Sequence, residues 1–93
     1  MNRLVLQAQL MERGAVRYTP AGLPALDLKL SHESMVSEDA QARKVSLEIR
    51  AVALGAITQR IVSQALGSTA VYAGFLANSR NGRGLLFHVT ALD

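Results

Sequence analysis

The sequence predicts an all-β fold, a five-stranded barrel with one short helix between the third and fourth strands. Three observations lead to this prediction. Three runs of alternating residues come first, one short run at helical spacing follows, and two further alternating runs end the chain. Strand, strand, strand, helix, strand, strand is the order of the oligonucleotide/oligosaccharide-binding (OB) fold, which binds ligands with its second and third strands and two of its loops.

The first run, from Arg3 to Met11, predicts a half-buried strand. One face carries Leu4, Leu6, Ala8 and Leu10, and the other carries Arg3, Gln7 and Gln9 together with Val5 and Met11. Val5 and Met11 are apolar on an otherwise polar face. We therefore expect them to meet their copies across the two-fold axis of a homodimer, which would add buried surface to a small chain.

The next two strands follow the turn signal Thr19-Pro20-Ala21-Gly22. After Pro24, the residues Leu26, Leu28 and Leu30 alternate with Asp27, Lys29 and Ser31, and His32 continues the apolar face. The segment from Glu33 to Ala42 is polar and acidic and has no period, so we expect a mobile loop there. Strand three, from Arg43 to Ala53, alternates most cleanly, with Val45, Leu47, Ile49, Ala51 and Ala53 on one face.

The rest of the chain predicts the helix and the last two strands. Apolar residues at helical spacing predict a helix of about three turns from Ala56 to Leu66, which Gly67 ends and which should plug one end of the barrel. Strands four and five are expected at Thr69–Ala77 and Leu85–Leu92, with Phe75 and Phe87 in the core. The segment 78–84 between them is a basic hairpin loop with an Asn81-Gly82 turn.

Length and composition indicate one domain, residues 1–93, in the cytoplasm. The chain has no cysteine, which excludes thiol catalysis and disulfides and suits a reducing compartment. Its start lacks the pattern of a signal peptide, and no apolar run approaches the length that spans a membrane, so no membrane contact is expected. The net charge of +3 and the pI of about 10.0 favour a polyanionic partner, and the alternative is an ordinary solubility charge.

No residue pattern predicts catalysis, a metal site or a cofactor. His32, His88 and the seven carboxylates show no metal-ligand spacing, and no serine lies in a nucleophile motif. The acidic pair Glu38-Asp39 is more simply a solvated loop. We therefore expect a protein that is not an enzyme.

The basic residues predict a groove for single-stranded nucleic acid. Arg17 lies in the first loop, Lys29, Lys44 and Arg50 share a strand face, and Arg80 and Arg83 lie in the last loop. Single-strand binding usually combines such charge with aromatic stacking, and Tyr18 is the best candidate for a stacking residue. Two alternatives stay open: Tyr18 as a partly buried residue at a strand end, and the last loop as a plain exposed hairpin.

Several segments together resemble the bacterial primosomal replication protein N family, also called the PriB family, which is related to single-stranded DNA-binding protein. The resemblance covers nearly the whole chain. It rests on Asn2-Arg3-Leu4-Val5-Leu6, the turn Thr19-Pro20-Ala21-Gly22-Leu23-Pro24, the strand end Leu30-Ser31-His32-Glu33, and Gly74-Phe75, Asn81-Gly82 and His88.

The resemblance implies a homodimeric barrel without enzymatic activity. It further implies binding to single-stranded DNA, to the primosomal helicase and to other primosome proteins during replication restart. The family's basic positions correspond to Arg17, Arg43, Arg80 and Arg83 here. A family aromatic falls near Ser46 and a family basic position falls on Glu33, so we expect DNA binding that is more electrostatic. The alternative is a protein-interaction adaptor of the primosome with only weak DNA binding.

Overall fold

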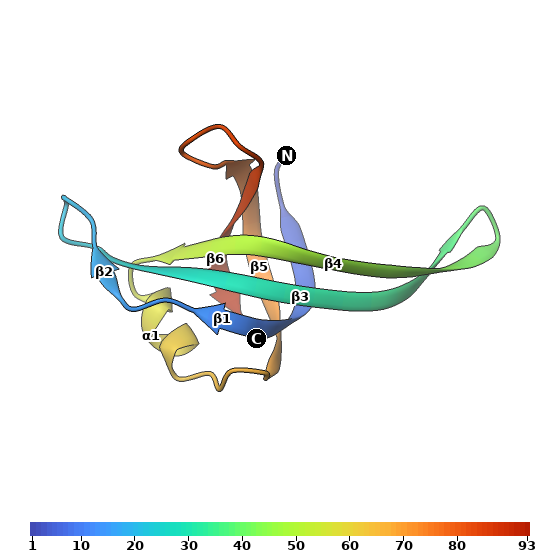
Figure 1. Ribbon diagram of the computed structural model, residues 1–93, viewed down its shortest axis with the longest axis horizontal. Helices are drawn as coiled ribbons and strands as arrows, with labels where there is room; N and C mark the ends of the chain where they lie inside the picture. Colours follow the sequence, from blue (N-terminus) through green and yellow to red (C-terminus); the bar gives the residue numbers. More distant parts are fainter.

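The computed structural model describes all residues, 1–93, and its long strands confirm the predicted OB barrel (Figure 1). The elements are β1 (Leu4–Arg13), β2 (Arg17–Tyr18), β3 (Pro24–Glu38), β4 (Gln41–Leu54), α1 (Ile57–Val62), β5 (Thr69–Asn78) and β6 (Leu85–Leu92). The two-residue β2 is an addition to the five predicted strands. The helix α1 therefore lies, as expected, between the third and fourth long strands.

The barrel closes because β1 pairs with strands on both sides. Leu4–Gln9 pair with β5, and Gln9–Arg13 pair with β3, with a bulge between Leu10 and Glu12. A bulge bends a strand and increases its twist, which lets β1 pass from one sheet edge to the other. On the opposite side, a short parallel pairing joins Ala51–Ala53 of β4 to Phe87–Val89 of β6.

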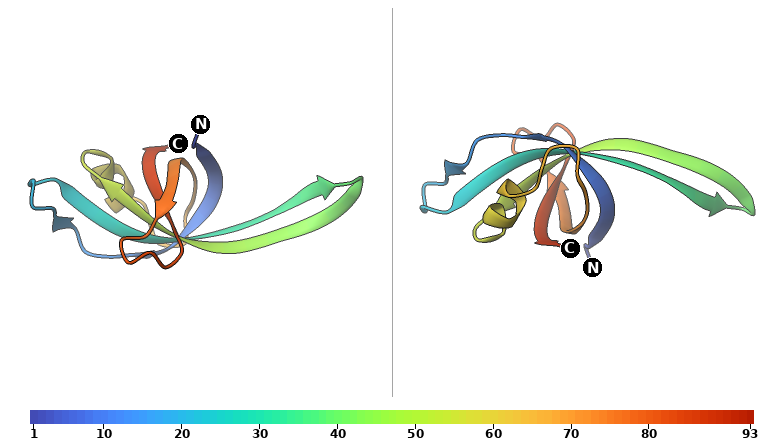
Figure 2. Two further views of the ribbon diagram at one scale, coloured as in Figure 1. Left: turned by 90° about the horizontal axis from the view of Figure 1, so that it is seen from above. Right: turned by 90° about the horizontal axis from the view of Figure 1, so that it is seen from below.

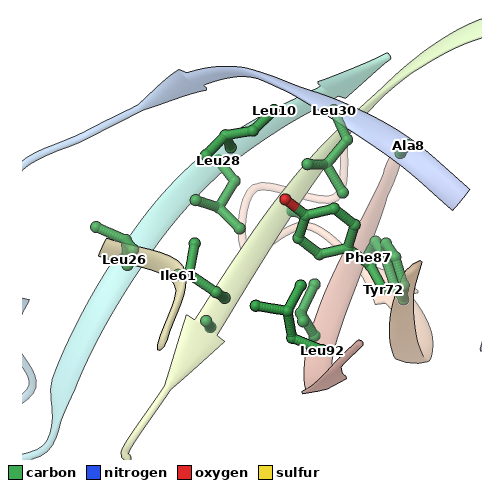
Figure 3. Close-up of a cluster of buried hydrophobic side chains, with 12 residues drawn as sticks. Ala8, Leu10, Leu26, Leu28, Leu30, Ile61, Tyr72, Phe87 and Leu92 are labelled. Atoms are coloured by element: carbon green, nitrogen blue, oxygen red, sulfur yellow. The ribbon is translucent and has the colours of Figure 1, made fainter. Parts of the chain in front are cut away.

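The core lies inside this barrel and follows the alternation of the sequence. Leu26, Leu28 and Leu30 of β3 point inward, and Tyr72 and Phe87 are the largest fully buried side chains (Figure 3). From α1, Ile61 inserts into the same cluster, so the helix closes one end of the barrel. The Tyr72 hydroxyl has no hydrogen-bond partner among protein groups, and burial raises the pKa of this residue.

The helix is shorter than the predicted Ala56–Leu66, since α1 ends at Val62. Arg13 of β1 donates from its guanidinium to the main-chain carbonyls of Ile61 and Gln64, which satisfies acceptors at the helix end. Farther on, Gly67 has a φ of 87° and pairs with the main chain of Leu10. The tertiary contacts to β1 thus end the helix about one turn before the apolar spacing suggests.

The predicted mobile loop at Glu33–Ala42 is wrong, because this segment is the end of a long two-stranded hairpin. The strands β3 and β4 stay paired as far as Glu38 and Gln41. Asp39 and Ala40 form the two-residue turn, and both have positive φ, of 51° and 61°, as a type I′ hairpin turn requires. We call residues 32–47 the arm, because there β3 and β4 pair only with each other (Figure 2).

The expectation that Phe75 packs in the core is wrong. Its side chain is 38% exposed on the outer face of β5, opposite His88 of β6. The neighbouring Gly74 explains how closely these strands approach. A Cβ atom built at Gly74 would lie 1.7 Å from the carbonyl oxygen of His88 and 3.1 Å from the Cα of Val89.

Gly74→Ala should therefore destabilise the barrel, because the added methyl group can fit only if β5 and β6 separate. We expect a loss of about 3 kcal/mol in the free energy of unfolding, the upper end for overpacking. Thermal denaturation followed by circular dichroism measures this loss as a fall in Tm of more than about 10 °C. Gly14→Ala is the matched control, because a Cβ there meets only ordinary contacts at 3.7 Å and 3.9 Å. Equal Tm values for the two variants would contradict the argument.

Candidate functional site

Two adjoining hollows lie on the outer face of the barrel, over β3, β4 and β6. One has a volume of about 570 Å³ and the other about 350 Å³, and both are lined by Asp27 and Leu86. Together they hold most of the predicted basic residues. Their charged lining residues are Arg17, Asp27, Arg50, Arg80 and Arg83, and His88 lines the larger hollow. We call this surface the cationic groove.

Strand register builds the floor of the cationic groove. Asp27 of β3 pairs with Val52 of β4, Val52 pairs with His88 of β6, and His88 pairs with Phe75 of β5. Paired residues on neighbouring strands point to the same face of a sheet, so these four side chains form one row across the outer surface. In the adjacent row Lys29 of β3 lies opposite Arg50 of β4.

The last loop forms one rim of the cationic groove and is ordered by its own hydrogen bonds. Ser79 donates its hydroxyl to Asn81 at 2.7 Å, and the main-chain N–H of Arg83 donates to the same Asn81 oxygen at 3.0 Å. The main chains of Ser79 and Gly84 also pair at 3.0 Å. The loop between β5 and β6 (Figure 1) is therefore held in a defined conformation, and its Arg80 and Arg83 line the two hollows.

Arg17 forms the other rim and is paired with a carboxylate. Its Nε and Nη2 each donate to one oxygen of Asp27 at 3.1 Å, a two-point contact between exposed groups. This hydrogen bond and the attraction of the Asp27 charge raise the pKa of Arg17 above its ordinary value. Exposed ion pairs of this kind contribute little stability, so Arg17 can exchange Asp27 for an anion from solution.

The other basic residues differ in their partners. Lys29 lies 3.6 Å from Glu48, which partly neutralises the row that it shares with Arg50. Arg50, Arg80 and Arg83 form no ion pair within the chain. The cationic groove thus offers three unpaired guanidinium groups, and guanidinium groups bind phosphate oxygens in a two-point geometry.

Two predicted site residues lie outside the cationic groove, on the arm. Lys44 pairs with Met35 and shares the outer face with Lys29 and Arg50, but it is six residues from Arg50 along β4. That spacing corresponds to about 20 Å of strand. Arg43 is its direct neighbour, points to the opposite face, and makes an ion pair of 2.7 Å with Glu38.

Tyr18 also lies apart from the cationic groove, although it follows Arg17 directly. Successive strand residues point to opposite sides, so Arg17 faces the cationic groove and Tyr18 faces α1. Tyr18 is 71% exposed and lines a separate hollow of about 300 Å³. The apolar members of this hollow are Val16, Tyr18, Pro24 and Val62, and we call it the α1 pocket.

Three residues in the row that crosses the cationic groove were not predicted as site residues: Asp27, Phe75 and His88. Asp27 was recognised only as a polar position on a strand, and nothing local reveals that Arg17 folds back onto it. Phe75 and His88 stack with a centroid separation of 4.7 Å and an angle of 8° between the rings. The alternation within Leu85–Leu92 could have revealed His88. Phe87 was expected in the core, so the next residue of the strand must point outward.

The edge of β1 is the third surface with predicted site residues. Val5 is 52% exposed and Met11 is 43% exposed, so both lie on the outside of the barrel. Between Leu4 and Ala8 the strand has a pairing partner on one side only, β5. On the other side, the Gln7 carbonyl accepts a hydrogen bond of 2.6 Å from Nδ1 of His32.

No three His, Asp or Glu side chains gather where they could hold a metal ion. No helix is long and apolar enough to cross a membrane.

The chain is similar to known proteins over most of its length. Residues 2–91 match a sequence family described as another single-strand binding protein family. The replication restart protein PriB of Bordetella pertussis is 50% identical over 80 residues, which cover 86% of this chain and 75% of the relative.

Solved structures agree with the sequence matches. The PriB structure from Ralstonia solanacearum has 38% sequence identity and a TM-score of 0.91, and the match covers 100% of this chain and 96% of that one. The single-stranded DNA binding protein from Thermus aquaticus has 26% identity and a TM-score of 0.77. That match covers 100% of this chain and 49% of the longer Thermus chain.

Proposed function

The chain belongs to the PriB family of replication restart proteins, and from this premise we propose that it binds single-stranded DNA through the cationic groove. The observation that carries the proposal is the meeting of Arg50, Arg80 and Arg83 in the cationic groove without ion-pair partners. In this proposal these three groups and Arg17 contact phosphates. Lys29 adds to the positive electrostatic potential of the surface. Lys44 extends the contact along the arm, and Arg43 is a separate proposed DNA contact on the opposite face of the arm.

The proposed mechanism is electrostatic and involves no chemical step. Each phosphate that an arginine neutralises releases condensed counterions, which drives binding at low salt and weakens it at high salt. Few groups in the cationic groove could read base edges, so little base specificity is expected. The protein would act as a binding component of the replication-restart primosome and not as an enzyme.

The primosomal helicase and other primosome proteins are the proposed protein partners. The α1 pocket supports such a contact, because Val16, Tyr18 and Val62 expose apolar surface on the side away from the cationic groove. This pocket also favours the second candidate function, a primosome adaptor with only weak DNA binding. The carboxylates of Asp27 and Glu48, which occupy Arg17 and Lys29, favour the same alternative.

A homodimer is part of the proposal. The unpaired edge of β1 between Leu4 and Ala8 could add a second copy of itself, and the exposed Val5 and Met11 lie on that strand. A two-fold axis there would double the basic surface, to a formal charge of about +6 from +3 for each chain.

The first prediction from the proposed function concerns the salt dependence of DNA binding. Arg50→Ala, Arg80→Ala and Arg83→Ala should each weaken binding to oligo-dT and reduce the log–log salt slope by about 0.7, the loss of one phosphate contact. Fluorescence-anisotropy titration at several salt concentrations measures both effects. Arg60→Ala on α1 makes the same charge change outside the cationic groove and should leave the slope unchanged. Equal slopes for all variants would remove the groove assignment.

The second prediction concerns the carboxylate in the cationic groove. Asp27→Asn removes a negative charge beside the proposed phosphate path and frees Arg17 from its two-point contact, so DNA affinity should rise several-fold. The same titration measures the change. Asp39→Asn is the control, since it removes one negative charge at the tip of the arm and asparagine tolerates the positive φ there. If both variants gain the same affinity, the effect comes from net charge alone, and the specific role of Asp27 is contradicted.

The third prediction concerns oligomeric state. Light scattering of the eluting protein should give twice the chain mass of 10.0 kDa at micromolar concentration. Val5→Glu places a charge on each side of the proposed two-fold contact and should shift the mass to that of a monomer. Val62→Glu changes a valine on α1 that is 41% exposed, against 52% for Val5, and should leave the dimer intact. A monomeric wild-type mass would overturn the dimer.

A further inference from the structure

The Phe75–His88 pair is an exposed aromatic stack on a protein whose other large aromatic rings are either buried or turned away from the cationic groove. Tyr72 and Phe87 are fully buried, and Tyr18 faces the α1 pocket. Phe75 alone combines 38% exposure with a place on the outer face of the barrel. The chain has no tryptophan that could take its place.

The stack is held rigidly. Phe75 and His88 are direct cross-strand partners of β5 and β6, and their rings lie parallel within 8° at 4.7 Å. The close main-chain approach at Gly74 fixes the two strands at this point. Stacking on His88 uses one face of the phenyl ring, so its exposed surface is available to a third planar group. A preordered ring loses little conformational freedom when it binds one.

The stack also lies beside the basic residues of the cationic groove. His88 lines the same hollow as Arg17 and Arg80, and it stands in the row that runs from Asp27 through Val52 to Phe75. A strand whose phosphates contact the rim arginines would pass with its bases near this row. Single-strand binding proteins combine these two elements, a basic track for the backbone and aromatic rings for the bases.

We propose that the Phe75–His88 stack is a nucleobase platform, on which one base of the bound single strand stacks against the phenyl ring. The proposal rests on the proposed function, because it needs a strand in the cationic groove. It adds a contact to bases where the arginines supply only contacts to phosphates. The ligand class is therefore a single-stranded nucleic acid with intact, unpaired bases.

The test compares Phe75→Leu with Phe75→Tyr in anisotropy titrations against oligo-dT and against an oligonucleotide of equal length with abasic sites. Loss of a stacking ring should weaken oligo-dT binding about tenfold. The salt slope should stay unchanged, because no phosphate contact is lost. Phe75→Tyr should retain the wild-type affinity. With the abasic strand, Phe75→Leu and the wild type should bind equally.

Leu66→Ala is the control, since it removes an exposed apolar side chain after α1 that lines neither the cationic groove nor the α1 pocket. It should leave both affinities unchanged. Photo-crosslinking of wild-type protein to an oligonucleotide with 5-iodouracil should attach the base within β5 or β6 at Phe75 or His88, and this needs no variant to fold.

The outcomes separate the two proposals. If the arginine variants weaken binding but Phe75→Leu does not, and the crosslink lies elsewhere, the cationic groove stands and the platform is overturned. If Phe75→Leu weakens binding to the abasic strand by the same factor, the ring has a structural role only. If the wild-type protein does not bind oligo-dT, the proposed function fails and the platform fails with it.

Discussion

The short parallel pairing between β4 and β6 is the contact on which the other features of the outer surface depend. Only Ala51–Ala53 and Phe87–Val89 take part, yet this pairing closes the barrel between segments that are far apart in sequence. It places His88 beside Val52 and carries the last loop to the side where Arg17 lies. Small side chains at Ala51 and Ala53 leave room inside for Phe87 and the leucines of β3. Without this pairing the arginines would belong to two unrelated surfaces.

The basic residues of the cationic groove, of the row beside it and of the arm are more balanced by carboxylates than the net charge of +3 suggests. Arg17, Lys29 and Arg43 each have a carboxylate partner, whereas Arg50, Arg80 and Arg83 have none. Exposed pairs of this type contribute little stability, so each carboxylate can give up its cation to a phosphate. A phosphate must compete with Asp27 for Arg17, but not with any residue for Arg80. The free arginines would therefore set the affinity, and the paired ones would adjust it.

The sequence predicted the barrel because alternation follows burial, and burial alternates from Leu4 to Leu10 of β1 and from Leu26 to Leu30 of β3. The predictions were wrong where tertiary contacts or the chemistry of a turn determine the structure. The arm was missed because its turn is Asp39-Ala40, without the glycine that usually marks such a hairpin, and because both its faces meet solvent. Phe75 was assigned to the core on hydrophobicity alone, although Tyr72 and Leu76, at the inward parity of β5, already fill that space. Arg13 could not be foreseen as the contact that ends α1.

The alternation of side chains at β2 separates the cationic groove from the α1 pocket, although the two surfaces contain neighbouring residues of the sequence. Arg17 and Tyr18 are neighbours in sequence, but the first turns to Asp27 in the cationic groove and the second turns to Val62 on α1. A ligand on one surface therefore does not cover the other, and the two share only the strand between them. Two successive residues of one strand point to opposite faces. A chain of 93 residues can thus present a charged surface and an apolar surface at one edge of a sheet. In a small β-barrel, the face to which a side chain points therefore decides which surface it joins. Its distance along the sequence from a motif does not.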